Sequence, residues 1–245
     1  MLFPLGVVFF PLQFLISKRL FRPMLPGEIF IRLCGSGYLS FAKYFYHNTL
    51  TEKYDPSLHY KQALEEACVG GHLDVVQWIF EFRPYTTDEF QSNVNIANAI
   101  SCDYGHVAIL KWLFTTYHSQ INFWAFCGAC AHGHLDIVKW IASNKHYTKH
   151  DISTECYSAF RLACANGHLS IAKWLTAAFH ITQEDARSRG EYVLYYACIN
   201  GHLEMAKWLV KTFSFDKNDF LTFKKELVDR ERLTVEVSEW IFTLL

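Results

Sequence analysis

The chain alternates two kinds of short apolar stripe, each with the spacing of an α-helix. Within residues 63–68, small apolar residues recur at i, i+1, i+4 and i+5, which places them on one narrow helix face. A second, wider stripe runs from Leu73 to Phe80, while Asp74 lies off it. The pattern predicts two short helices joined by a tight turn. Helices this short are marginal alone, so neighbouring copies have to bury their stripes.

The same unit recurs along the chain, marked by a Gly-His dipeptide at the turn. The glycines stand at 71, 105, 133, 167 and 201, which gives spacings of 34, 28, 34 and 34 residues. Stepping back 34 residues from Gly71 reaches Gly37, and a degraded closing copy covers residues 233–241. The chain therefore contains about seven repeats, including degenerate terminal caps.

Each copy places a cysteine three residues before its glycine and an aromatic residue seven residues after it. We expect the glycines to end the first helix in left-handed geometry and the aromatic residues to lie in the core. The two series are Cys34, Cys68, Cys102, Cys130, Cys164 and Cys198, and Tyr44, Trp78, Trp112, Trp140, Trp174 and Trp208.

The unit A-x-x-x-A-C-x-x-G-H-L-x-[IV]-[VA]-K-W-[LI] resembles the ankyrin repeat over residues from about 27 to 245. The resemblance implies an all-α, ankyrin-type helix-turn-helix repeat solenoid that binds another protein. The Lys-Trp pair and the cysteine are similar to repeats that large DNA viruses of amoebae encode. The Thr-Pro-Leu-His start and the Asp-Gly hairpin tip of the family are absent. Whether β-hairpin fingers or irregular loops connect the repeats therefore stays open.

The 28-residue interval between Gly105 and Gly133 predicts a shortened connection within Thr115–Asn122, because the helix motifs on both sides are intact. Trp124 lies just past this connection and outside the tryptophan series. It is either an anchor for a partner or a residue that packs against the shortened connection.

Composition and charge bear on the kind of partner and on the cellular compartment. The chain has 23 Lys and Arg against 24 Asp and Glu, a balance that argues against nucleic acid as the main partner. Repeat spacing accounts for six of the eight cysteines, so we expect reduced thiols and a cytoplasmic protein, of the host cell if viral. We expect an apolar segment at 1–23 and the solenoid at 24–245. The apolar run within residues 2–16 is either a membrane or signal element or a cover for the first repeat.

Two cysteine and histidine pairs invite a chemical interpretation. Cys127-x-x-Cys130 has the spacing of a redox or zinc motif, and His132-x-His134 that of a metal pair. The repeat explains Cys130 and His134, and no further ligands follow at matching spacing, so core packing is favoured. The repeat histidine is expected to bridge backbone groups of neighbouring repeats. Catalytic motifs are not found, so we expect no enzyme, no metal and no cofactor.

We therefore expect a protein-binding scaffold that acts as a monomer and binds a partner of unknown identity on its concave and loop surfaces. The alternative is a substrate-recruiting adaptor of a ubiquitin ligase, because Leu25–Ile29 resembles the opening of an F-box. The expected contact residues precede the glycines or lie in connecting segments. They are Asp103, Tyr104, Trp124, His132, His150, Asn166, Arg187, Arg189 and Asn200.

Overall fold

The computed structural model describes residues 25–49, 57–81, 85–154, 157–187, 192–221 and 233–244. All regular structure in these ranges is helical, as the sequence predicts. The chain divides into two compact units, residues 1–82 and 83–245, which are described separately below. The predicted apolar segment 1–23 lies outside the described residues.

The first unit contains two helix pairs. They are α2 (Pro26–Gly35) with α3 (Leu39–Thr49), and α4 (Ser57–Val69) with α5 (Leu73–Glu81). Helix α2 packs against α3 and α4, and α4 packs against α5. The fully buried Phe30 ring meets the rings of Tyr60 and Trp78 edge-on, at centroid distances of 5.9 and 6.1 Å. An aromatic cluster therefore holds the two pairs together.

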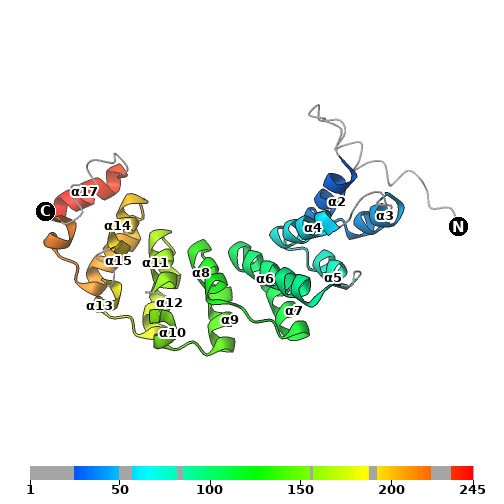
Figure 1. Ribbon diagram of the computed structural model, residues 1–245. Coiled ribbons are helices and arrows are strands. Elements are labelled where there is room, and N and C mark those ends of the chain that lie inside the picture. The colour runs from blue at the N-terminus through cyan, green and yellow to red at the C-terminus, as the bar shows by residue number, and fades with distance from the viewer. Residues whose placement is uncertain are drawn as a thin grey trace. The chain divides into compact units, whose positions relative to one another are not determined.

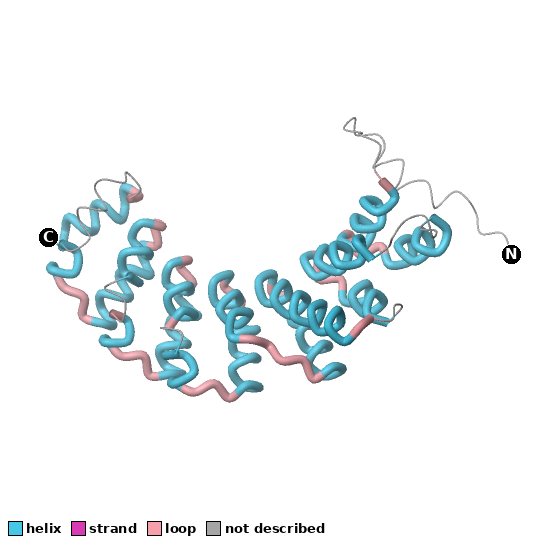
Figure 2. Tube along the Cα trace, viewed as in Figure 1, coloured by secondary structure: helices cyan, strands magenta, loops and turns pink. Residues whose placement is uncertain are grey.

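The second unit stacks further helix pairs in two rows (Figure 1, Figure 2). Neighbouring members of the first row pack side by side, α6 on α8, α8 on α11 and α11 on α14. We call this row the inner helices: α6 (Thr87–Tyr104), α8 (Phe123–His132), α11 (Ser158–Ala165) and α14 (Tyr192–Ile199). The outer helices are α7 (Val107–Tyr117), α9 (Leu135–Lys145), α12 (Leu169–Phe179) and α15 (Leu203–Phe213), and α17 (Val235–Leu244) follows them.

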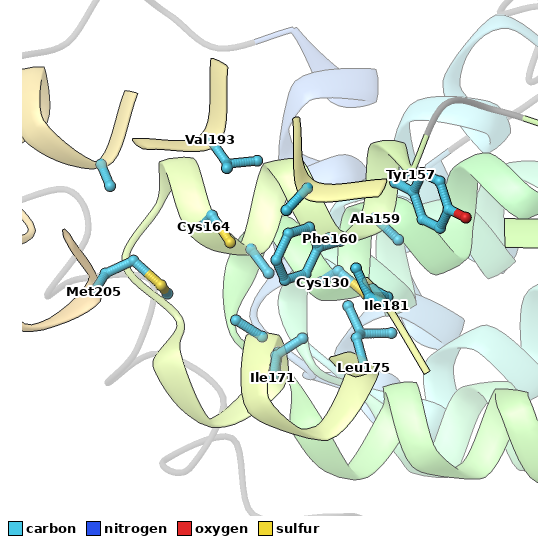
Figure 3. Close-up of a cluster of buried hydrophobic side chains, with 14 of the residues drawn as sticks. Cys130, Tyr157, Ala159, Phe160, Cys164, Ile171, Leu175, Ile181, Val193 and Met205 are labelled. Carbon is cyan, nitrogen blue, oxygen red and sulfur yellow. The ribbon is translucent and has the colours of Figure 1, made fainter. Parts of the chain in front are cut away.

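The core of the second unit lies between the two rows (Figure 3). Phe160 fills its centre at 0% exposure, and the small residues Ala159 and Cys164 on the same helix are equally buried. Small side chains there let neighbouring inner helices approach closely. The seven cysteines of the described residues are buried and free. Burial raises the pKa of the Cys198 thiol to about 12, so these thiols pack as small apolar groups.

The turn glycines adopt the predicted left-handed geometry, with φ between 72° at Gly71 and 89° at Gly133. The histidines His72, His134, His168 and His202, each directly after a turn glycine, reach back to the preceding repeat. Nε2 of His134 donates to the carbonyl oxygen of Asp103 at 2.8 Å, and Nε2 of His168 to that of Ala131 at 2.8 Å. Both expectations for the Gly-His pair are thus confirmed, and the pair links adjacent layers.

The tryptophan series is less buried than the sequence suggests. Trp78 is 8% exposed, but Trp140, Trp174 and Trp208 are only half-buried against the core. Each of the latter two rings meets a phenylalanine five residues later on its own helix, as Trp174 meets Phe179 at a centroid distance of 5.9 Å. The expectation that the aromatic series lies in the core is met by Trp78 and in part by these three tryptophans, which pack against the core. It is wrong for Tyr44, which is 64% exposed on α3.

Two of the segments that connect repeats contain a short helix, and no strand occurs in the described residues. The two helices are α10 (Lys149–Thr154) and α13 (Gln183–Ala186). Before each helix stands a threonine, followed three residues later by an aspartate, and the two cap one another. The Thr182 amide donates to Asp185 Oδ2 at 2.8 Å, and the Asp185 amide to Thr182 Oγ1 at 3.3 Å. This reciprocal capping satisfies the exposed amides of a first helical turn.

The shortened connection differs from this pattern. Residues 118–122 lead directly from α7 to α8, and the Asn122 side chain accepts a hydrogen bond from the Ala125 amide at 2.8 Å. Thr115 still belongs to α7, so the lost residues correspond to the short capped helix rather than to loop. Both helices flanking the connection are intact, as predicted.

Candidate functional site

The residue before each turn glycine lies at the carboxyl end of an inner helix and is exposed. In the second unit, four successive layers place such a residue there, with Tyr104 54% exposed. The recurring alanine and cysteine positions that support them are buried in every copy. A varied row on a constant support is what a recognition surface needs. The row consists of Tyr104, His132, Asn166 and Asn200.

Three of these side chains are held by the backbone of their own or the preceding inner helix. Nδ1 of His132 donates to the Gly128 carbonyl at 3.0 Å, and Nδ2 of Asn166 donates to the Leu162 carbonyl at 3.1 Å. Nδ2 of Asn200 donates across the layers to the carbonyl of Ala165 at 2.7 Å. The row is therefore ordered before any partner arrives, which lowers the entropic cost of binding.

Asp103 lies over the neighbouring inner helix. Its Oδ1 is 3.7 Å from Nδ1 of His132, and the two side chains remain 41% and 55% exposed. A methyl group at Gly128 would overlap Oδ1, so the bare glycine backbone makes room for the carboxylate. Burial raises the pKa of Asp103, and the neighbouring imidazoles of His132 and His134 act in the opposite direction.

Trp124 is the most exposed tryptophan of the described residues, at 64%. It stands in the first turn of α8, directly after the shortened connection. Its exposure contradicts the interpretation that the ring packs against that connection. A short capped helix, such as follows α9 and α12, is missing at this layer, and the indole stays open to solvent.

Helix α8 packs against α6 and α11, and these two neighbours carry charge of opposite sign, because α11 contains Arg161, whose Nη2 donates to Ser158 Oγ at 3.2 Å. Helix α6 contains Asp88, Glu89 and Asp103 and no Lys or Arg. Helix α8 contains none of the four charged residue types, and His132 is its only titratable side chain besides its thiols. The α6 side of Trp124 is therefore acidic, and the α11 side carries the single cation Arg161.

The contact residues predicted in the connecting segments are His150, Arg187 and Arg189, none of which directly precedes a turn glycine. His150 is exposed on α10. Nη2 of Arg187 lies 2.8 Å from Asp219 Oδ2 and 3.2 Å from the carbonyl of Ser214, and its guanidinium stands over the Phe215 ring at 4.8 Å. These contacts make Arg187 a link between successive repeats. Arg189 lies outside the described residues.

The sequence reasoning missed Gly128 and the capping threonines and aspartates. An alignment of the repeats shows that Gly128 is unusual, because other copies carry the large residues Ile100, Leu162 and Tyr196 at its position. The Thr-x-x-Asp spacing of a capping box is likewise visible at Thr148 and Thr182.

The pairs with metal-like spacing lie apart from any larger donor set. Cys127 and Cys130 are both buried on α8. His132 and His134 face the carbonyls of Gly128 and Asp103. Within the described ranges, no group of three His, Cys, Asp or Glu side chains gathers in a way that could hold a metal ion.

The sequence gives the N-terminal region two further candidate roles. Residues Leu25–Ile29, which resemble an F-box opening, form the start of α2, where Glu28 Oε2 accepts a hydrogen bond from the Leu25 amide at 3.2 Å. The other role is membrane association. No helix in the described parts of the chain combines the length and the apolar character that crossing a membrane requires.

Comparison with protein families identifies the repeats. The family model "Ankyrin repeats (3 copies)" matches residues 126–220, which run from α8 to the segment after α15. No curated protein matches the chain. Residues 126–220 therefore carry ankyrin repeats, and the described helices are consistent with an all-α ankyrin-type solenoid, a class of fold that serves protein–protein interaction. The match does not extend to the narrower resemblance to repeats of amoebal viruses, which stays a prediction.

Proposed function

We propose that the chain is a scaffold that binds another protein, without catalysis, through the inner helices of its second unit. The proposed contact residues are those predicted from the sequence: Asp103, Tyr104, Trp124, His132, Asn166 and Asn200, with His150 and Arg189 at the connecting segments. Arg187 contributes by holding its segment in place. The observation that carries the proposal is the 64% exposure of Trp124, whereas Trp78 is buried and Trp140, Trp174 and Trp208 pack against the core.

The recurring alanine and cysteine positions of the repeats are buried, whereas the varied positions before the turn glycines are exposed. An exposed tryptophan leaves a large apolar area in water, and burying such a residue in an interface is a common source of binding energy. The neighbouring exposed residues Tyr104, His132 and Asn166 supply hydrogen-bonding groups at the rim, on helices fixed by the Gly-His links. Rigid support of varied side chains favours recognition over a purely structural role.

A ubiquitin-ligase adaptor is the alternative from the sequence, and it remains a separate proposal. Leu25–Ile29 lies at the start of a helix whose Phe30 is fully buried within the first unit. A cytoplasmic setting, a monomeric state and a viral origin are likewise proposals. The free, buried thiols are compatible with a reducing compartment.

The test is a selection of short random peptides displayed on phage against the immobilised full-length chain, followed by affinity measurement. We expect selected peptides to lose most of their affinity for a triple variant, Tyr104→Ala, His132→Ala and Asn166→Ala. The matched control alters one exposed outer-helix residue in each of the same layers: Thr116→Ala, Lys139→Ala and Lys173→Ala. Equal loss in both variants, or loss only in the control, would place binding elsewhere.

A further inference from the structure

We infer that Trp124 and Asp103 together form a site for a basic residue, Lys or Arg, of the bound protein. This inference rests on the proposed function and specifies the chemistry of the partner. The aliphatic stem of the basic side chain would pack on the indole, and its charged end would meet the Asp103 carboxylate.

Trp124 and the Asp103 carboxylate lie along one face of α8. Trp124, Gly128 and His132 stand at i, i+4 and i+8 on α8, so successive members share a face and are about 6 Å apart along the axis. Asp103 reaches this stripe from α6, because its Oδ1 lies where a side chain of residue 128 would begin. The carboxylate thus sits roughly one helical turn from the indole's point of attachment.

Gly128 leaves free the space that the Asp103 carboxylate occupies beside α8. Glycine is one of the least favourable residues inside a helix, and other copies carry Ile100, Leu162 and Tyr196 there. Any β-carbon at residue 128 would displace Asp103. The glycine therefore opens the stripe between Trp124 and His132 to the carboxylate and to an incoming side chain.

The charges on the α6 side of Trp124 favour a cationic ligand. Asp103 is the carboxylate beside α8, and α6 and α8 carry no Lys or Arg. The one cation of the neighbouring α11, Arg161, donates to Ser158 Oγ of its own helix at 3.2 Å. Partial burial of Asp103 removes some of its water and makes the carboxylate a better partner for a cation than a fully solvated one. A cation placed beside an indole gains further attraction from the face of the ring. Acidic or phosphorylated ligands would be repelled by the same residues.

The experiment uses the peptides selected by the full-length chain and reads their composition and affinity. We expect enrichment of Lys or Arg over the unselected library. Asp103→Asn and Trp124→Ala should each weaken binding of a selected basic peptide about fivefold or more. Replacing its basic residue with Gln should cost a similar factor in the wild type and much less in Asp103→Asn. The controls are Asp136→Asn, an exposed carboxylate on α9, and Phe242→Ala, an exposed aromatic residue on α17.

The outcomes separate this inference from the proposed function. Peptides that bind the inner helices without enrichment of basic residues, or with unchanged affinity for Asp103→Asn, would overturn the inference and leave the scaffold function standing. A selection that yields no peptide dependent on the inner helices would contradict both. Circular dichroism melting of each variant identifies any loss caused by unfolding, and Trp124→Phe, which keeps an aromatic face, should retain more affinity than Trp124→Ala.

Discussion

The imidazole of His168 lies directly over Gly133 of the preceding repeat. A β-carbon at Gly133 would stand 2.7 Å from Nδ1 of that ring, and Nε2 of the same ring donates to the carbonyl of Ala131 at 2.8 Å. The glycine is therefore required for two reasons, its φ of 89° and the close approach of the histidine. The recurrence of Gly with His reflects a contact between layers as well as a turn within one.

This relationship predicts that the two residues are energetically coupled. Gly133→Ala should lower the free energy of unfolding by more than ~1 kcal/mol, from the left-handed backbone and from displacement of His168. In a His168→Ala background only the backbone cost remains, so the penalty should be smaller by roughly 0.5–1 kcal/mol. A double-mutant cycle from urea unfolding measures this. An identical penalty in both backgrounds would show that the ring does not press on the glycine.

Half-burial of the outer tryptophans predicts an intermediate cost for their removal. Trp174→Ala should lower the free energy of unfolding by about 2–3 kcal/mol, below the roughly 3–5 kcal/mol of a fully buried aromatic residue. Trp124→Ala should change it by less than about 0.5 kcal/mol, because its ring is exposed. Thermal melting and urea titration of both variants give the comparison. A strongly destabilised Trp124→Ala would mean that the residue supports the fold instead of binding.

Asn98 predicts a stabilising substitution. Its side chain is 2% exposed on α6, and neither amide atom has a hydrogen-bond partner among the described residues. Other copies place Leu64, Phe126, Phe160 and Leu194 at this position. Asn98→Leu should raise the free energy of unfolding by about 1–2 kcal/mol, since it removes a buried amide and restores an apolar contact. Asn95→Leu, at an exposed position on the same helix, should give no such gain.

Asp185 predicts a specific dependence of stability on pH. Burial raises its pKa, but hydrogen bonds from Lys149, Tyr157 and Thr182 outweigh burial and lower the pKa to about 2 from the usual 3.8. A lowered pKa in the folded state contributes stability that is complete above about pH 4 and is lost as pH falls through about 2.

The corresponding variant tests that contribution. Asp185→Asn should be less stable than wild type by about 2 kcal/mol at neutral pH, and the two stability curves should converge as pH approaches 2. Urea midpoints measured across this range give both curves, with Asp136→Asn as a surface control. A constant gap at all pH values would mean that the ionised carboxylate is not what stabilises the fold.

The fold was largely readable from the sequence because its supporting positions repeat. The spacing located the turn glycines, the histidines that follow them and the shortened connection before α8. The depth of the tryptophans was not readable, because a helical stripe gives the direction of a side chain but not how far the neighbouring row covers it. The helices α10 and α13 were missed because they are too short to carry an apolar stripe, and only capping pairs such as Thr182 and Asp185 mark them.

The sequence predicted only part of the candidate site, because it does not show contacts between helices. Tyr104, His132 and Asn166 were identified because each directly precedes a turn glycine, and the end of each inner helix is exposed. The contact of Asp103 with Gly128 joins two helices, and a repeat alignment gives no distance between them. Arg187 looked like a surface residue but forms an ion pair with Asp219, a partner 32 residues away.

Hydroxyl-radical footprinting of the full-length chain, with and without a selected peptide, locates the binding surface. If the inner helices of the second unit form that surface, peptide binding protects Trp124 and Tyr104 from oxidation, while Phe242 on α17 and the half-buried Trp174 on α12 react unchanged. Protection confined to outer-helix residues, with Trp124 as reactive as in the free chain, would contradict this assignment of the surface.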